Sequence, residues 1–254
     1  MSKSNFFAKY LKNIDKIIHS LLEKNINKLK FNNLLGLIKN NKIFLFFVAL
    51  IILFLSYVSL PNLYNQSIIQ EKIRNELSAN FNLEFNFVNK LDYQFFPRPH
   101  FISYESLIID NKNKISDIKE AKIFISFKNL FSVENLKIKE IILHKANFNL
   151  NYSNYNFFLE ILDNNFKDSS LKIHNGNIIY RSMVNDVLFI NKIFKMNYVY
   201  NAKELKNILY SENELFNIPY SIEIFKDLQK KIFFSKINFN QFRLKIENQF
   251  NYID

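Results

Sequence analysis

The sequence predicts an α+β protein that begins with an amphipathic helix and one transmembrane helix and continues as a mainly antiparallel β-sheet with a few short helices. Three observations support this prediction. Apolar residues recur at helical spacing between residues 6 and 29, an uncharged apolar run spans residues 43–60, and apolar and polar residues alternate in many segments after residue 82. Strands with one apolar and one polar face suit antiparallel sheet, because parallel sheet needs both faces covered.

Composition limits the class of protein before any motif is considered. The chain has 254 residues, no cysteine, two glycines and four prolines. Disulfides and thiolate metal sites are therefore excluded. The net charge of +11 is concentrated at one end, since residues 1–42 hold nine lysines against two acidic residues. The basic excess belongs mostly to this short segment and does not predict nucleic-acid binding.

Residues 1–42 form the first predicted part, a cytoplasmic basic amphipathic segment. Its apolar positions are Phe6, Phe7, Tyr10, Leu11, Ile14, Ile17, Ile18, Leu21 and Leu22. Lys9, Lys12 and Lys16 lie between them and give the predicted helix a basic face. We expect this helix to lie on the anionic inner leaflet of a membrane. The alternative is a partner-binding or loosely ordered tail.

Residues 43–60 form the second part, the predicted transmembrane helix. They read IFLFFVALIILFLSYVSL and are followed by Pro61. A helix of this length rises about 27 Å, which matches the hydrocarbon core of a bilayer. The residues that mark its length are Ile43, Phe47, Ile51, Phe54 and Leu60. The unbroken apolar run argues against a buried core helix, and the long preceding segment argues against a cleaved signal peptide.

The lysines set the expected orientation of this span. Basic residues favour the cytoplasmic side, and the nearest ones after the span, Lys72 and Arg74, are offset by Glu71 and Glu76. Residues 1–42 are therefore expected in the cytoplasm. The rest of the chain is expected outside it, which in a double-membrane bacterium is the periplasm. The predicted location is the bacterial inner membrane, with a single pass.

Residues 62–254 form the third part, a single predicted β domain. Its first element is a helix over residues 63–80, with Ile68, Ile69, Ile73 and Leu77 on its apolar face. Alternation then predicts strands that contain residues 83–87, 123–127, 146–152, 171–173, 216–224 and 242–246. Pro219 indicates that the fifth of these is an edge strand or carries a bulge.

Three further signals interrupt the strands. Helical spacing predicts short helices over residues 155–164, with Phe157, Phe158, Ile161 and Leu162, and over residues 201–210, with Leu205, Ile208 and Leu209. Asn175-Gly176 predicts a hairpin turn or a bulge.

The sequence predicts a non-enzymatic protein. The four histidines, His19, His100, His144 and His174, are scattered, and no zinc-protease, P-loop or dinucleotide-binding motif occurs. No serine lies in a nucleophile-elbow context. We therefore expect no catalytic residue, cofactor or metal site. Arg98, between two prolines, is expected to belong to a stiff strand entry, with contact to a lipid headgroup as the alternative.

The order of these features resembles the N-terminal region of the AsmA-like family, inner-membrane-anchored periplasmic proteins of Gram-negative bacteria. The matching features are a basic N-terminus, one span, LPNLYN, an amphipathic helix, FFPRPHFISYESLIID, AKIFISFKNLFS, LKIKEIILHKANFNL and LKIHNGNIIYRS. The resemblance covers about residues 43–250. The chain departs from the family in lacking a glycine near Asn80 and the long β region that usually follows, so we expect a short or truncated member.

The resemblance implies a role in outer-membrane biogenesis and a curved sheet whose apolar groove holds phospholipid acyl chains. The residues expected to line such a groove are Ile123, Ile125, Phe127, Phe148, Leu150, Ile173, Ile222 and Ile224. The alternative is that this face packs against the chain's own helices and an opposing sheet, as a closed core. Expected partners are the membrane, phospholipid and outer-membrane assembly proteins.

A second functional hypothesis is a structural adaptor that modulates outer-membrane protein assembly. An exposed sheet edge at residues 242–250 can pair with a strand of a partner. About ten strands spaced 4.7–4.9 Å apart stack to roughly 45 Å, which is too short for a complete bridge between two membranes. In either hypothesis the chain is expected to be a membrane-proximal module or one part of an assembly.

Overall fold

The computed structural model describes residues 42–252 apart from residues 111–112, 129 and 165. The predicted amphipathic helix within residues 6–29 lies outside the described residues. The chain divides into two compact units, Met1–Ser56 and Tyr57–Asp254.

Helix α3 (Lys42–Ser59) coincides with the predicted transmembrane segment. The side chains of Ile43, Phe47, Ile51 and Phe54 are all more than half exposed. By length and composition this helix is able to cross a membrane. Leu60, expected as the last residue of the span, begins the short 3-10 helix η1 (Leu60–Leu63) and is half-buried. The apolar stretch that could span a membrane runs over Leu45–Leu63 and includes it.

Helix α4 (Gln66–Phe81) is the predicted helix over residues 63–80, displaced by a few residues. It begins after Asn65, whose side chain accepts a hydrogen bond from the Ser67 backbone N–H at 2.9 Å. The predicted apolar face is confirmed at Ile69, Ile73 and Leu77, which are buried together with Phe81, whereas Ile68 is exposed.

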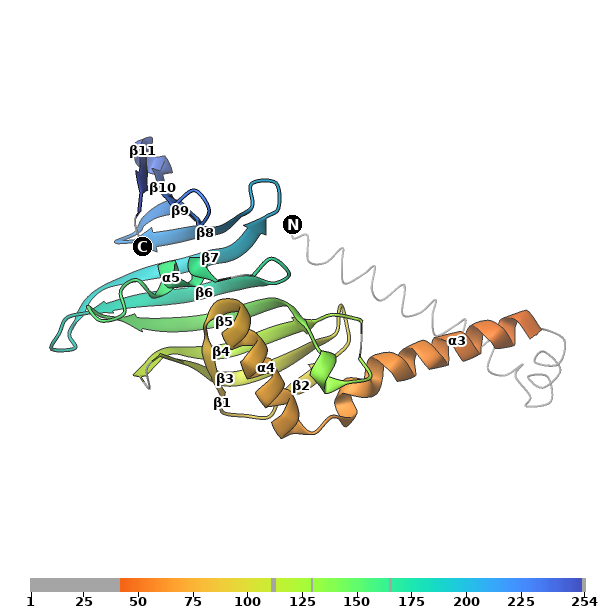
Figure 1. The fold of residues 1–254 in the computed structure, drawn as a ribbon. Helices are drawn as coiled ribbons and strands as arrows, with labels where there is room; N and C mark the ends of the chain where they lie inside the picture. Colours follow the sequence, from red (N-terminus) through yellow and green to blue (C-terminus); the bar gives the residue numbers. More distant parts are fainter. Residues whose placement is uncertain (1–41, 111–112, 129, 165, 253–254) are drawn as a thin grey trace, which may run out of the picture. The chain divides into compact units, whose positions relative to one another are not determined.

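One sheet of eleven strands follows in the described part of the chain (Figure 1). The strands are β1 (Glu84–Phe87), β2 (Asp92–Gln94), β3 (His100–Asp110), β4 (Asn113–Ile125), β5 (Ile138–Leu150), β6 (Ser170–Arg181), β7 (Val187–Asn201), β8 (Lys206–Leu215), β9 (Ile218–Asp227), β10 (Ile232–Phe239) and β11 (Leu244–Asn251). Their order is β1-β3-β4-β5-β6-β7-β8-β9-β10-β11, and β2 pairs with β3. All of these pairs are antiparallel except β5–β6, so the sheet is mixed.

The parallel pair is connected by a crossover over residues 151–169 (Figure 1). It contains helix α5 (Phe157–Glu160) and the 3-10 helix η3 (Ile161–Asp163), which confirm the helix predicted over residues 155–164 in a shorter form. The four apolar residues expected there, Phe157, Phe158, Ile161 and Leu162, are all buried. Two other 3-10 turns, η2 (Val133–Asn135) and η4 (Asn240–Phe242), lie in loops between strands.

The hydrophobic core lies between one face of the sheet and the side chains of α4 and the crossover. The rings of Phe81 and Phe166 stack at 5.6 Å, and those of Phe148 and Phe158 meet edge-on at 5.0 Å. Tyr198 is fully buried, and its hydroxyl donates to the Phe158 carbonyl oxygen at 2.7 Å. Pairs of this kind bind the crossover to the sheet both by apolar burial and by satisfied polar groups.

The strand faces predicted before residue 175 are largely confirmed. Leu83, Phe85 and Phe87 are buried, and so are Ala146 and its alternating partners Phe148 and Leu150. Tyr152, expected on the same strand face, lies beyond the end of β5 and is 75% exposed.

The helix predicted over residues 201–210 is wrong. Residues 202–205 form a turn and β8 begins at Lys206, so Leu209 is buried as a strand residue. The reason is tertiary: Asn207 Nδ2 donates to the carbonyl oxygens of Leu162 and Asn164 at 3.0 and 2.6 Å. Contacts with the distant crossover therefore outweigh the local helical spacing.

The strand predicted over residues 216–224 begins two residues later than expected. Phe216 and Asn217 both have positive φ and form the turn between β8 and β9. Pro219 is the second residue of β9, which lies between β8 and β10 and is not an edge strand. The pairing of β9 with β10 ends at Ser221. Pro219 lies beyond this end, so the absence of its N–H costs no hydrogen bond to β10.

Residues with left-handed backbone form a row across neighbouring strands. Glu105 in β3, Lys145 in β5 and Asn175 in β6 have φ of 58°, 52° and 54°. Lys119 of β4 lies opposite both Glu105 and Lys145, between paired residues on either side. The Asn175-Gly176 signal thus marks an irregularity within β6 and not a hairpin turn.

Gly176 lets β5 and β6 approach closely at this row. A Cβ atom added there would lie 2.6 Å from the Ala146 carbonyl oxygen, so the backbone of one strand would have to move. We expect Gly176→Ala to lower the free energy of unfolding by about 1–3 kcal/mol. Urea unfolding of the full-length protein in detergent, followed by circular dichroism, measures this change.

Met183→Ala is the control for this variant. Met183 lies in the turn after β6 and is 83% exposed, so its truncation should change the unfolding free energy by less than about 0.5 kcal/mol. Equal stability of the Gly176 variant and the wild type would show that the close approach imposes no constraint.

Candidate functional site

The eight residues expected to line an apolar groove fall into three environments. Five of them are core residues with at most 4% of their surface exposed: Ile123, Ile125, Phe148, Leu150 and Ile173. Side chains of the same chain cover these five, so they form part of a closed core. Phe127 lies in the loop after β4 and is exposed, and its carbonyl oxygen accepts a hydrogen bond from the Tyr57 hydroxyl at 2.7 Å.

The remaining two, Ile222 and Ile224, lie on β9 and are half-buried. Ile224 is opposite Leu209 of β8, which is opposite Tyr198 of β7. Directly opposed residues of antiparallel strands share a face. Strand β9 therefore continues the same apolar face that the core uses.

This face extends to the end of the sheet as the β9–β11 apolar surface. Its apolar residues are Tyr220, Ile222, Ile224, Phe233, Ile237, Phe239, Leu244, Ile246 and Phe250, and the same face also carries Lys226, Ser235 and Asn248. Rings stack across it, Tyr220 on Phe239 at 5.5 Å and Phe233 on Phe250 at 4.9 Å. On β11 its side chains are between 40% and 52% exposed. The polar pair Ser235–Asn248 separates Phe233 and Phe250 from Ile237 and Ile246 on this face. Exposed apolar side chains that gather on one face mark interaction sites.

The opposite face of the same three strands is mostly polar, but Phe225 and Phe234 also lie on it, with their rings stacked at 4.8 Å. Glu223 is opposite Lys236, and Lys236 is opposite Glu247. On β11 itself, Lys245 Nζ lies 2.7 Å from Glu247 Oε1. Strand β11 is thus amphipathic, with one apolar and one charged face, and its outer edge pairs with no strand in the described part of the chain.

Arg98 belongs to an ion cluster on the polar face of the sheet. Its Nη2 donates to Glu140 Oε2 at 2.5 Å, its guanidinium lies 4.3 Å from the Phe124 ring centroid, and Lys172 Nζ donates to Glu140 Oε1. Burial alone raises the pKa of Glu140, but the hydrogen bonds from Lys172 and Arg98 outweigh burial and lower it. Arg98 therefore connects the segment before β3 to β4 and β5.

The lowered pKa of Glu140 gives this cluster a pH dependence. A carboxylate whose pKa is lower in the folded state stabilises the fold above its unfolded value of 4.5, and this contribution is lost as the pH falls through the folded pKa. We expect Glu140→Gln to cost about 1–3 kcal/mol of unfolding free energy at pH 7 and progressively less below pH 4.5. Denaturant unfolding of the full-length protein between pH 3 and 7 tests this.

Glu71→Gln on the exposed face of α4 is the matched control, with an expected change of less than about 0.5 kcal/mol at any pH in this range. A difference between wild type and the Glu140 variant that stays constant down to pH 3 would contradict the assignment.

His144 and His174 lie side by side on the polar face, with ring centroids 5.2 Å apart. Burial, assisted by His144 and by Lys195 and Lys172, lowers the pKa of His174. In the described part of the chain, no group of three His, Cys, Asp or Glu side chains gathers in a way that suits a metal ion.

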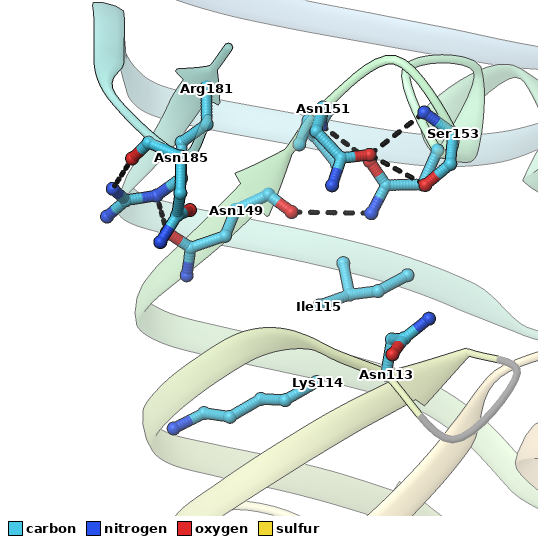
Figure 2. A pocket seen from close by; sticks show the side chains of 10 residues that line it. Asn113, Lys114, Ile115, Asn149, Asn151, Ser153, Arg181 and Asn185 are labelled. Carbon is cyan, nitrogen blue, oxygen red and sulfur yellow. Dashed lines mark hydrogen bonds between the residues drawn. The ribbon is translucent and has the colours of Figure 1, made fainter. Parts of the chain in front are cut away.

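A polar pocket of about 710 Å³ opens where β4 and β5 separate. We call it the β4–β5 cleft. Its residues are Asn113, Lys114, Ile115, Asn149, Leu150, Asn151, Ser153, Asn154, Arg181 and Asn185. Figure 2 shows the first three on one side and Asn149, Asn151, Ser153, Arg181 and Asn185 on the other.

The cleft exists because the sheet splits at this end. The pairing of β4 with β5 reaches only Ser116 and Phe148, after which β4 pairs with β3 alone and β5 with β6 alone. Asn154 fills part of the gap. Its side-chain amide donates to the Asn149 carbonyl oxygen at 3.4 Å and accepts from the Asn151 N–H at 2.7 Å, as a residue of a neighbouring strand would.

Arg181 is held in place at the mouth of this cleft. Its Nε donates to Asn149 Oδ1 at 3.1 Å, and its Nη1 donates to the Asn185 carbonyl oxygen at 3.0 Å (Figure 2). Lys114, across the cleft, pairs with Asp117 at 2.5 Å and is half exposed. None of the residues that line the cleft is acidic.

Sequence reasoning missed this cleft. The signal was the cluster of asparagines at positions 149, 151 and 154 beside the predicted end of a strand. Asparagine is common throughout this chain, so the cluster did not stand out. The splitting of β4 from β5 is a tertiary feature that alternation does not report.

Comparison with known protein families finds no family model that matches this chain, and no curated protein matches it in sequence. The fold defines a broad class, a mixed β-sheet protein whose described residues include one helix long and apolar enough to span a membrane. The resemblance to the AsmA-like family rests on the order of sequence features alone.

Proposed function

We propose that this chain is a non-enzymatic, single-pass protein of the bacterial inner membrane that serves envelope biogenesis, as the AsmA-like resemblance implies. Its β domain handles phospholipid acyl chains along the β9–β11 apolar surface. The observation that carries this proposal is that the apolar face of the core continues from β8 to β11 beyond the crossover and is exposed on β11.

The geometry of this surface suits an acyl chain. Rows of opposed apolar residues, such as Ile222, Ile237 and Ile246, run across three strands. Each methylene that such a row removes from water contributes about 0.8 kcal/mol, so a partly covered chain binds reversibly. The charged face behind the surface favours water on that side.

The proposed topology rests on the charge distribution. Nine lysines precede the candidate span, and the basic residues that follow it are offset by acidic neighbours. This asymmetry favours a cytoplasmic N-terminus and a periplasmic β domain.

Photocrosslinking tests the lipid proposal. The full-length protein is reconstituted in vesicles that contain a phospholipid with a photoreactive acyl chain. We expect labelling on β9–β11 and expect Ile246→Glu, which places a charge on the apolar surface, to reduce it at least about fivefold, because burying an unpaired carboxylate is costly.

Gln249→Glu is the matched control, since it adds the same charge to the opposite, solvated face of β11. Equal labelling of both variants, or labelling confined to other elements, would rule out this surface as the acyl-chain site.

A second candidate function is the structural adaptor, and the free outer edge of β11 favours it. An unpaired edge offers backbone N–H and C=O groups to a strand of another protein. A photoreactive phenylalanine analogue in place of Phe250 separates the two functions in cells. Lipid adducts are expected if the apolar surface handles lipid, and protein adducts without lipid adducts would favour the adaptor.

A further inference from the structure

We propose that the β4–β5 cleft is a binding site for an anionic saccharide. This inference is independent of the proposed lipid function, because the cleft lies where β4 and β5 separate and shares no residue with the β9–β11 apolar surface.

The first step in the inference is the hydrogen-bonding capacity of the cleft. Asparagine side chains line it, and the carboxamides of Asn113 and Asn185, which make no hydrogen bond to the described part of the chain, each offer both a donor and an acceptor. Those of Asn149, Asn151 and Asn154 are partly or fully used within the protein. Sugar hydroxyls also donate and accept, so a sugar can form hydrogen bonds with both the N–H and the carbonyl group of a carboxamide. The split of the sheet adds backbone groups at residues 113–115, which no β4–β5 pairing uses, whereas Asn154 already bonds the backbone of Asn149 and Asn151.

The second step is charge. Lys114 and Arg181 line one cleft from different strands, and Asp117, the carboxylate that pairs with Lys114, is not among the lining residues. Two hydrogen bonds orient the Arg181 guanidinium, and its Nη2 group makes no hydrogen bond to the described part of the chain. A guanidinium that is fixed in this way is prepared to bind a carboxylate or a phosphate.

The third step is shape. The volume of about 710 Å³ lies in the range of small-molecule sites, but the lining is polar, which disfavours an acyl chain. The loop that forms one wall also carries Tyr152 and Tyr155, whose rings are 6.4 Å apart and mostly exposed. Exposed rings beside polar groups suit the apolar faces of sugar rings.

Calorimetric titration of the full-length protein in detergent tests the proposal with four probes: trigalacturonate, maltotriose, inorganic phosphate and rough lipopolysaccharide micelles. We expect trigalacturonate or the micelles to bind, with little binding of the other two. Preference for the micelles identifies a glycolipid headgroup as the source of the sugar, and preference for trigalacturonate identifies a free glycan. Equal binding of maltotriose, or of phosphate, would overturn the proposal.

Charge variants locate the site. Lys114→Gln and Arg181→Gln should each weaken binding roughly tenfold, because each removes one charge-assisted hydrogen bond. Lys245→Gln is the matched control, since Lys245 is equally exposed and is also paired with a carboxylate on its own strand. Arg181 also holds the β6–β7 turn, so Lys114→Gln gives an answer even if the Arg181 variant unfolds. If Lys114→Gln and Lys245→Gln weakened binding equally, the effect would come from the overall charge of the protein, and the proposal would be overturned.

Discussion

The parallel pairing of β5 with β6 is the constraint on which the rest of the sheet depends. Antiparallel neighbours join through a tight turn, whereas parallel neighbours require the chain to return along the whole strand. Residues 151–169 make that return, and they place Phe157, Phe158 and Leu162 on the core face. The crossover therefore supplies core residues because two strands in the middle of the sheet are parallel.

The same crossover determines where both candidate surfaces lie. Its first residues, from Asn151 to Asn154, form a wall of the β4–β5 cleft. Its far end is fixed to the following strands by Asn207, which donates to two crossover carbonyl oxygens, and by Lys226, whose Nζ lies 2.7 Å from Asp163 Oδ1. Beyond these contacts the strands are joined by short turns, and no α-helix of the described part of the chain follows β8 to cover the apolar face of β9–β11.

Local patterns were sufficient for some elements and not for others. Apolar spacing predicted α3, α4 and the buried faces of β1 and β5, because burial on one face leaves a regular period in the sequence. It failed at β8, because Asn207 forms a hydrogen bond to the crossover, more than forty residues away in the sequence. For the same reason, some of the expected groove residues are buried and others are not. Alternation places both Ile173 and Ile224 on apolar faces, but the position of the crossover decides which of the two is covered.

The row of left-handed residues at Glu105, Lys145 and Asn175 has an evolutionary consequence. Buried residues normally alternate with a spacing of two along a strand, but at this row the spacing is three. In β6 the buried positions go from Ile173 to Gly176, and in β5 from Leu143 to Ala146. Because neighbouring strands advance together, their apolar side chains stay in phase. Deletion of a single residue there would move the side chains in the rest of that strand to the opposite face of the sheet, while those of the neighbouring strands stayed in place. Length variation among homologues should therefore be confined to the turns, or occur in matched sets across adjacent strands.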